Sequence, residues 1–317
     1  MGNDRSQNRH KLSRDIVHRW EGNPLFDITD LDFKCSDIHN AGVVLFEGEI
    51  LLLVTIEHLA GKLCIHLAKP CDGHFSVDKT PFLQPCKDKK YQKHETYGVL
   101  DARVTYLEGV YYITYIALGN HGYRLGLAKT QDFESVERIG LISEPDTKTG
   151  VLFPQRIKGR YARLERPHEG HSVWVTYSDD LIYWGGSKLV ISPRDGFWDT
   201  SRIGVGSVPI EIDLGWLVLY YGAKDTSAGT IYRIGAIILD KNQPEKVIGR
   251  AGIPILSPRE NYERIGDIPN IVFSTGAILT SDGEINIFYG AANSCICIGT
   301  TTVEKIVATC MQSKEEY

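Results

Sequence analysis

An aspartate and an arginine two residues apart are the side chains in this sequence best suited to acid–base chemistry. Asp101 and Arg103 lie in segment 98–105 (GVLDARVT), ahead of the aromatic run GVYYITYIA. Residues two apart in a strand share one face, so the arginine can orient the carboxylate and shift its pKa. The pair fits a general acid with its partner, and it equally fits a structural ion pair.

Basic residues form a second candidate site. Lys148 and Arg166 lie close to glycine and proline in segment 148–167, and we expect them to point inward, whereas Lys158, Arg160 and Arg163 should alternate outward. The formal net charge is −5 and the pI is about 6.1, which argues against a nucleic-acid partner. Local cations in such a chain suit a small anion.

A fivefold repeat indicates which elements position these residues. Each unit is an alternating apolar run, a glycine turn and an aromatic-rich run. The turn glycines are Gly48, Gly109, Gly159, Gly215 and Gly283, at steps of 61, 50, 56 and 68 residues. Repeats of roughly 40–50 residues with several short strands are typical of β-propellers. We therefore predict an all-β, five-bladed β-propeller with a central axial active-site cavity.

The predicted organisation is one catalytic domain between two polar ends. Residues 1–19 form a polar N-terminal segment, 20–309 the propeller and 310–317 a polar tail. A short helix is expected near 258–262, capped by Ser257. The charged segment 86–97 fits either a solvated loop or a lid that faces substrate.

Composition and targeting signals favour a cytoplasmic protein. The seven cysteines show no disulfide framework, and Cys295 and Cys297 suit packing on one strand face. No run approaches the ~20 apolar residues of a membrane span. Gly2 with Ser6 fits a myristoylation pattern, and segment 11–19 partly matches a peroxisomal-type signal. These two patterns are the alternatives to a cytoplasmic location.

Taken in order, several segments resemble one enzyme family. They are GVLFPQRIKGRYARLERP, SDDLIYWG, RIGVGSVPIEIDLGWLVLYYGA, SPRENYERIGDIPNIVFSTGAI and YGAAN, within residues 23–306. This pattern is similar to glycoside hydrolase family 130, the inverting β-mannoside phosphorylases and mannosidases. The resemblance also implies a five-bladed propeller.

The resemblance assigns roles to individual positions. Asp101 matches the catalytic aspartate, a general acid whose proton travels through a sugar hydroxyl. The residues that match substrate-binding positions are Asn40, Arg103 and Asn293. The residues that match phosphate-binding positions are Lys148, Arg166, Arg202 and Tyr221, the last of which replaces the usual histidine.

Three positions depart from the family pattern. Ala102 replaces the proline of the usual Asp-Pro-Arg, Thr55 stands where an arginine contacts the sugar, and Asn293 replaces an aspartate. These departures resemble a kinetoplastid branch that turns over a β-1,2-mannan (mannogen) and includes nucleotide-sugar-dependent mannosyltransferases.

The balance of charges favours phosphorolysis. An inverting hydrolase needs a second carboxylate to activate water, whereas a phosphorylase needs cations that hold phosphate. We predict a reversible inverting β-1,2-mannoside phosphorylase that uses β-linked mannose oligosaccharides, mannose, mannose-1-phosphate and phosphate, with no metal or other cofactor. The alternatives are a hydrolase using Glu211, Asp213 or Glu263 as base, a GDP-mannose-dependent β-mannosyltransferase, and a non-catalytic scaffold.

Aromatic residues are candidates for the walls of the sugar site. Tyrosine and tryptophan rings can stack on sugar rings, and they also serve as packing between blades. The candidates are Tyr97, Tyr115, Tyr123 and Trp198.

Overall fold

Strands make up most of the regular structure in the computed structural model, which describes residues 15–312. They form four sheets, and nearly all neighbouring strands are antiparallel. Three short α-helices complete the described part of the chain. The all-β class predicted from the sequence is confirmed.

The largest sheet has eight strands in the order β10-β9-β8-β7-β5-β4-β3, with β6 paired to β5. One parallel pair, Leu63 with Gly98, joins its two halves. The strands are β3 (Asp37–Phe46), β4 (Glu49–Glu57), β5 (Leu63–Cys71), β6 (His74–Val77), β7 (Gly98–Leu107), β8 (Val110–Gly119), β9 (Gly122–Thr130) and β10 (Glu137–Leu141).

The next two sheets follow in chain order. The four-stranded sheet contains β11 (Thr147–Leu152), β12 (Tyr161–Pro167), β13 (Val173–Ser178) and β14 (Trp184–Ile191). The five-stranded sheet contains β15 (Arg202–Val205), β16 (Ile210–Ile212), β17 (Gly215–Thr226), β18 (Gly229–Leu239) and β19 (Val247–Arg250).

The last sheet combines both ends of the described chain. It contains β1 (His18–Arg19), β2 (Phe26–Asp27), β20 (Val272–Leu279), β21 (Glu284–Ala291) and β22 (Cys295–Thr302). Both β1 and β2 pair with β22. The 3₁₀ turn η2 (Ile28–Asp30) follows β2, and the helices are α1 (Lys89–Gln92), α2 (Asn261–Arg264) and α3 (Val303–Gln312).

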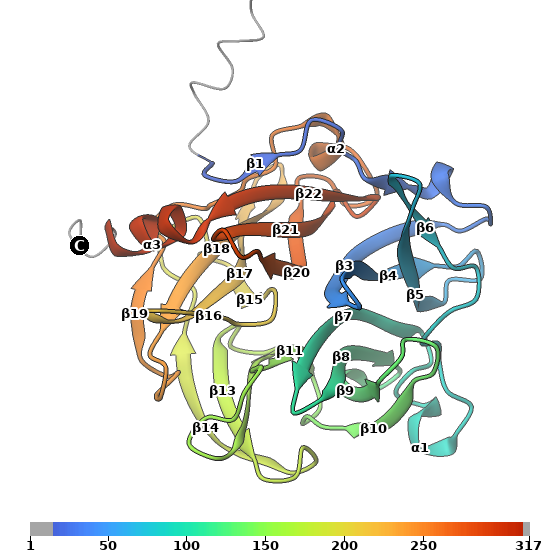
Figure 1. Ribbon diagram of the computed structural model, residues 1–317, viewed down its shortest axis with the longest axis horizontal. Coiled ribbons are helices and arrows are strands. Elements are labelled where there is room, and N and C mark those ends of the chain that lie inside the picture. The colour runs from blue at the N-terminus through green and yellow to red at the C-terminus, as the bar shows by residue number, and fades with distance from the viewer. Residues whose placement is uncertain (1–14, 313–317) are drawn as a thin grey trace, which may run out of the picture.

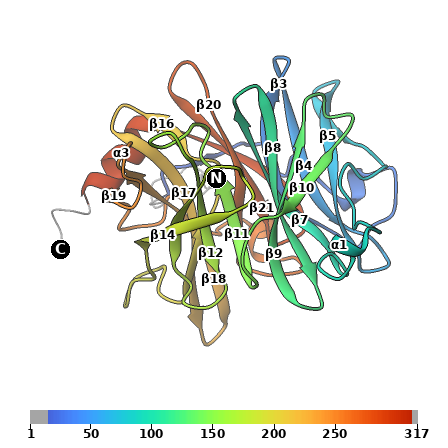
Figure 2. The same cartoon turned by 90° about the horizontal axis from the view of Figure 1, so that it is seen from below.

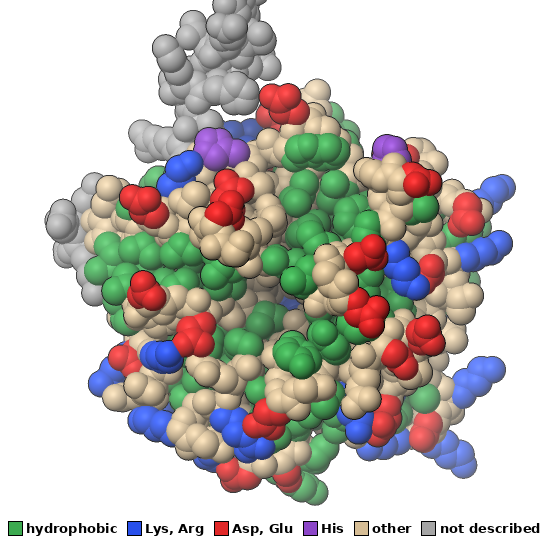
Figure 3. All heavy atoms as spheres, viewed as in Figure 1, with side chains coloured by type: hydrophobic (Ala, Val, Ile, Leu, Met, Phe, Trp, Pro, Cys, Tyr) green, Lys and Arg blue, Asp and Glu red, His purple; other side chains and the backbone are tan. Residues whose placement is uncertain are grey.

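The sheets surround a common centre (Figure 1). Strands β3, β7, β11, β15 and β20 lie nearest the middle, and each contacts strands of a neighbouring sheet or half-sheet. Figure 2 shows the same sheets from below, with β7 to β10 side by side. In the space-filling view, the face seen in Figure 1 is hollowed at its middle (Figure 3).

Two-residue turns explain some of the repeated glycines. Glu47 and Gly48 join β3 to β4 with φ values of 51° and 85°, and Glu108 and Gly109 join β7 to β8 with 53° and 82°. Two successive positive φ angles match the twist of antiparallel strands, and the second position favours glycine. Gly48 and Gly109 therefore set two of the hairpins that the repeat predicted, whereas Gly215 is the first residue of β17 and Gly283 lies in the four-residue loop between β20 and β21.

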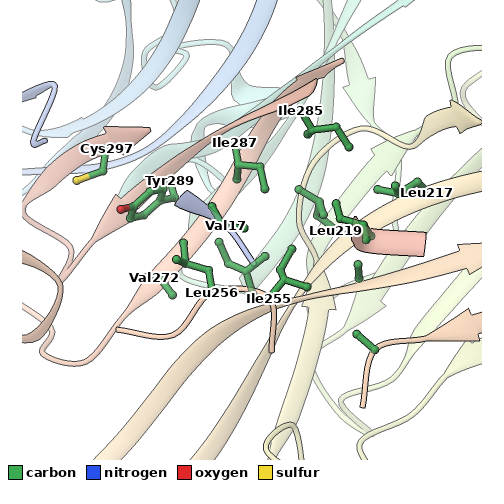
Figure 4. Close-up of a cluster of buried hydrophobic side chains, with 14 of the residues drawn as sticks. Val17, Leu217, Leu219, Ile255, Leu256, Val272, Ile285, Ile287, Tyr289 and Cys297 are labelled. Atoms are coloured by element: carbon green, nitrogen blue, oxygen red, sulfur yellow. The ribbon is translucent and has the colours of Figure 1, made fainter. Parts of the chain in front are cut away.

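Apolar side chains fill the space between the sheets. Figure 4 shows one cluster, in which Leu217 and Leu219 of β17 pack with Ile285 and Ile287 of β21. Full burial of such a side chain contributes about 1.5–3 kcal/mol. Cys295 and Cys297 belong to this cluster, which confirms that they pack in the core.

The ends of the described chain are more ordered than the sequence suggests. Val17 is buried, and β1 brings residues 18–19 into the last sheet although we assign them to a polar segment. Helix α3 continues across the expected boundary at residue 310, where Cys310 is buried. The Gly2 pattern and residues 11–14 of the peroxisomal-type pattern lie outside the described residues.

One local expectation needs correction, and the structure adds detail to a second. Helix α2 begins at Asn261 rather than near 258, and Glu260 with Glu263 forms its capping box in place of Ser257. Segment 86–97 is anchored as well as charged, because the fully buried Glu95 accepts hydrogen bonds from Cys86 N (2.7 Å) and Arg138 Nη2 (2.9 Å).

Candidate active site

Asp101 lies at a bulge of β7 and is only 8% exposed. Asn40 Nδ2 donates to Asp101 Oδ1 (2.9 Å), and the Asp101 N–H donates to Thr55 Oγ1 (2.9 Å). A side chain at Gly290 would collide with Asn40, since its Cβ would lie 2.5 Å from Asn40 Oδ1. Asp101 Oδ2 accepts no hydrogen bond from any of residues 15–312.

The backbone of Asp101 is held in an unusual conformation. Its φ of 55° is in the left-handed region, which costs free energy for a residue other than glycine. The Thr55 and Asn40 contacts, from β4 and β3, fix this conformation from two sides. Such strain clusters at functional sites, which supports Asp101 as the reactive carboxylate.

Arg103 supports Asp101 through the backbone rather than through its carboxylate. It is fully buried, and burial lowers its pKa. Its guanidinium donates to the carbonyl oxygens of Asp101 (2.8 Å), Val205 (3.0 Å) and Gly206 (2.6 Å). We expected a substrate contact at this position, and the geometry instead gives Arg103 a positioning role that links β7 to the end of β15.

Replacing Arg103 should destabilise the fold. Arg103→Met removes the donor from three buried carbonyl oxygens, each worth about 1–3 kcal/mol when unsatisfied. We expect the free energy of unfolding in urea to fall by at least about 3 kcal/mol. Arg160→Met is the control, because Arg160 pairs with Asp179 at the surface and its loss should change stability by about 0.5 kcal/mol or less. Equal stability of the two variants would contradict this role.

Arg166 is the centre of a buried cationic cluster. It is 1% exposed, yet no carboxylate within residues 15–312 forms an ion pair with it. Its Nη2 donates to the Tyr221 hydroxyl (2.5 Å), and its Nε is buried without a partner. An uncompensated buried charge is costly, so the arrangement favours an anionic ligand.

Other cations complete this cluster. Arg202 Nε and Nη2 donate to the Tyr232 hydroxyl (3.0 and 2.6 Å), and Arg202 Nη1 lies 3.8 Å from Asp225. Lys148 Nζ lies 4.9 Å from the centre of the Tyr123 ring. Lys148, Arg166 and Tyr221 lie on strands of two adjacent sheets. Arg202 is linked to Tyr221 through Tyr232, whose ring centroid lies 6.0 Å from that of Tyr221.

Two histidines of the cluster escaped sequence reasoning. The His168 ring stacks on Tyr123 (5.8 Å between centroids) and lies 6.0 Å from the His171 ring. Burial lowers the pKa of His171, and so do Arg166, His168 and Arg202. The sequence signal that could have identified them is the run RPHEGH, in which His168 and His171 lie two and five residues after Arg166.

His171 should make stability depend on pH. The folded protein keeps His171 neutral at pH values where an unfolded histidine, with a pKa near 6.5, binds a proton. The unfolded chain then binds more protons, so stability falls as the pH drops from 6.5 through the lowered pKa. We expect a steeper loss between pH 6.5 and 5 for the wild type than for His171→Gln, measured by urea unfolding without phosphate. Parallel profiles would contradict the assignment.

One predicted surface arginine is buried. Lys158 is exposed and Arg160 is partly exposed, as expected, but Arg163 is 2% exposed. Arg163 Nε and Nη2 donate to Glu165 Oε2 (2.9 and 2.5 Å). Arg163 and Arg166 thus lie on the same strand, but their charges are balanced differently. Arg163 forms an ion pair with Glu165, whereas no carboxylate among residues 15–312 pairs with Arg166.

Comparison with known proteins decides which family this site represents. The model of glycoside hydrolase family 130, described as beta-1,4-mannooligosaccharide phosphorylase, matches residues 7–312. The chain belongs to glycoside hydrolase family 130. It is 30% identical to a beta-1,2-mannobiose phosphorylase of Listeria innocua, over 88% of this chain and 94% of the relative. It is 31% identical to a beta-1,4-mannooligosaccharide phosphorylase of Ruminococcus albus, over 93% and 90%.

Solved structures agree with this placement. The Listeria innocua beta-1,2-mannobiose phosphorylase, in complex with beta-1,2-mannobiose, superposes with a TM-score of 0.83 at 28% identity, covering 93% of this chain and 99% of that one. A mannose phosphorylase from Leishmania mexicana gives 0.64 at 13% identity, over 86% and 85%. The second likeness shows a shared fold alone, so membership of the kinetoplastid branch stays a prediction.

Two of the three residues that we identify as departures from the family 130 pattern make defined contacts in this chain. Thr55, in place of the arginine, is buried and accepts the Asp101 N–H. Asn293 Nδ2 donates to Asp267 Oδ2 (3.1 Å) and lies 3.1 Å from His39 Nε2. A carboxylate, that of Asp267, therefore lies next to Asn293, and sequence reasoning did not select this residue.

The three carboxylates considered as water bases lie elsewhere in this family 130 protein. Glu211 is exposed and pairs with Lys241, and Asp213 is also exposed. Glu263 is fully buried and pairs with Arg19 (2.7 Å) rather than with its neighbour Arg264. Each of these positions argues against activation of a water molecule at Asp101.

The aromatic candidates divide into packing and exposed residues. Tyr115 is buried and donates to Glu95 Oε1 (3.0 Å), and Trp198 packs on Tyr220 (5.6 Å between centroids). Tyr97 is 51% exposed. Tyr123 belongs to the cationic cluster, because its ring contacts Lys148 and His168.

The described part of the chain offers neither a metal-ion site nor a membrane-spanning helix. Residues 15–312 contain no group of three or more His, Cys, Asp or Glu side chains placed to hold a metal ion. Among the helices of this part of the chain, none has the length and apolar character needed to cross a bilayer.

Proposed function

We propose that this protein is a reversible inverting β-1,2-mannoside phosphorylase. The observation that carries the proposal is Arg166, a buried guanidinium that has no carboxylate partner within residues 15–312 and donates to Tyr221. A water molecule needs no such cation, whereas phosphate needs positive charge to overcome its own repulsion. The β-1,2 linkage follows the beta-1,2-mannobiose phosphorylase relative.

In the degradative direction, the reaction is a single displacement at C1 of the terminal mannose. Asp101 donates its proton toward the leaving glycosidic oxygen, directly or through a sugar hydroxyl, and the C1–O bond breaks with its electron pair on that oxygen. A phosphate oxygen held by the cationic cluster attacks C1 from the opposite face. The products are α-mannose-1-phosphate and a mannan chain shorter by one sugar.

Different residues serve the sugar-binding part and the phosphate-binding part of this site. Asn40 and Thr55 hold Asp101, while Asn293 with Asp267 faces the sugar in our proposal. Lys148, Arg166, Arg202 and Tyr221 bind the phosphate. Phosphate is a co-substrate, and the absence of a metal or other cofactor stays a prediction.

We also propose that the four sheets are five blades of one propeller comprising residues 20–309. Its supporting observation is the eight-stranded sheet, whose halves share the single pair Leu63–Gly98. Each half has four principal strands, as in the β11–β14 sheet. The central cavity would then collect Asp101 and the cationic cluster, and a cytoplasmic location remains our expectation.

The decisive experiment supplies α-mannose-1-phosphate and mannose to the purified protein. Release of free phosphate together with growth of β-1,2-linked oligomannosides is the expected result. Mannose released from β-1,2-mannobiose in phosphate-free buffer would overturn the proposal in favour of a hydrolase. Product made from GDP-mannose and not from α-mannose-1-phosphate would overturn it in favour of a nucleotide-sugar transferase.

A further inference from the structure

A second group of arginines surrounds a cavity of about 450 Å³ beside β18. This volume lies within the range of small-molecule sites. Successive side chains of a strand point to opposite faces, so Tyr232, which contacts Arg202 of the cationic cluster, and Arg233, which lines the cavity, lie on opposite sides of β18. The cavity is therefore separate from the proposed active site.

The charge of the cavity is positive. Arg233, Arg259 and Arg264 line it together with one carboxylate, Asp15. Asp15 bonds to Arg259 (3.0 Å) and also to Arg19 (3.2 Å), which lies outside the lining. Three guanidinium groups against one shared carboxylate give the lining a formal charge of +2, in a chain whose net charge is −5.

Hydrogen-bond donors of this lining lack acceptors. Arg233 Nη1 and Trp198 Nε1 are buried atoms, and neither has a hydrogen-bond partner among residues 15–312. Burial lowers the pKa of Arg233, and the neighbouring Arg259 lowers it further. Guanidinium and indole groups only donate, so a ligand that satisfies them must bring acceptor oxygens and negative charge.

The remaining walls are largely apolar. Ile231, Ile253 and Pro254 lie beside Trp198 in the lining. A bare anion would leave these side chains in contact with water, whereas a ligand with a ring would cover them. Phosphate is well matched to the planar donor fork of arginine. We propose that this cavity binds a small phosphate monoester with an attached ring, such as a sugar phosphate.

The test counts binding sites by titration calorimetry with α-mannose-1-phosphate. The wild type should bind two equivalents, and Arg166→Met and Arg233→Gln should each bind one, because each variant loses a different site. Two equivalents bound by Arg233→Gln, or a single wild-type equivalent that Arg233→Gln retains, would overturn the proposal. A single wild-type equivalent that Arg233→Gln loses and Arg166→Met retains would support this cavity and contradict the phosphate site at Arg166. Because this readout needs no turnover, it stands or falls independently of the proposed reaction.

Two further arms sharpen the test. Arg264 is exposed, so Arg264→Gln should unfold at the same temperature as the wild type. The substitution should weaken binding of α-mannose-1-phosphate to the second site about threefold. Unchanged affinity in a folded Arg264→Gln would count against the site. Inorganic phosphate should bind the second site of Arg166→Met at least tenfold more weakly than the sugar phosphate. Equal affinity would refute the contribution of the ring.

Discussion

Asp101→Asn is expected to lower kcat for phosphorolysis of β-1,2-mannobiose by a factor on the order of 10²–10⁴, the contribution typical of general acid–base catalysis. The amide cannot donate the proton that the leaving oxygen requires. It nevertheless keeps the shape of the carboxylate, and its oxygen can still accept from Asn40 Nδ2. The KM for phosphate should therefore change little, because the cationic cluster is untouched. Initial rates of α-mannose-1-phosphate formation measure both parameters.

A change of leaving group separates acid catalysis from a structural role. An aryl β-mannoside expels a more stable anion and needs less proton donation, so Asp101→Asn should lose less activity on it than on mannobiose. Glu211→Gln is the matched control, since Glu211 is an exposed carboxylate paired with Lys241. Equal losses on both substrates, or wild-type activity of Asp101→Asn, would exclude Asp101 as the acid.

Arg166→Met should reduce kcat/KM for phosphate about 10- to 150-fold. A hydrogen bond to a charged group is worth about 1.5–3 kcal/mol, and each 1.4 kcal/mol corresponds to a factor of ten. The same change removes a buried charge that lacks a carboxylate partner in the described residues. Because that charge is costly in the free protein, stability should stay equal or rise. Steady-state kinetics measure the expected loss of kcat/KM for phosphate, and urea unfolding measures the expected equal or higher stability.

Arg163→Met is the matched control for Arg166→Met. Both arginines lie on β12 and both are almost fully buried. Arg163, however, bonds to Glu165 and to the Ile142 carbonyl oxygen, so its loss should lower stability and leave the KM for phosphate unchanged. If Arg166→Met were the destabilised variant and kept its kinetics, the proposed phosphate site would be wrong.

The sequence predicts the sheets of this protein better than its ends. Alternating apolar residues and turn glycines such as Gly48 are local signals, and they correctly indicated the hairpins and the all-β class. Helix α3 has only ten residues and follows β22 directly, so no loop signal separates it from the last strand. The burial of Val17 depends on residues such as Ile255, whose carbonyl oxygen accepts from Val17 N about 240 residues away, and no local pattern reports such a contact.

The candidate site likewise contains residues that local sequence signals identified and residues whose roles depend on distant parts of the chain. The types and order of residues selected Asp101 and Arg166, because a carboxylate and cations must be present for the chemistry. The role of Arg103 was not predictable, since its partners Val205 and Gly206 lie about 100 residues away and use backbone oxygens. Asp267 was missed for a related reason, because only the fold places it beside Asn293.

The pairing of β1 and β2 with β22 has a consequence for how the protein is made. A ribosome delivers residues 18–27 first, but their partners at 295–302 are about 270 residues later. At 5–20 residues per second, the first strands wait roughly 15–55 s before they can pair. During that interval Val17 and Phe26, both buried in the finished protein, are exposed on the nascent chain. Chaperones that shield apolar N-terminal segments should therefore increase the yield of folded protein during synthesis.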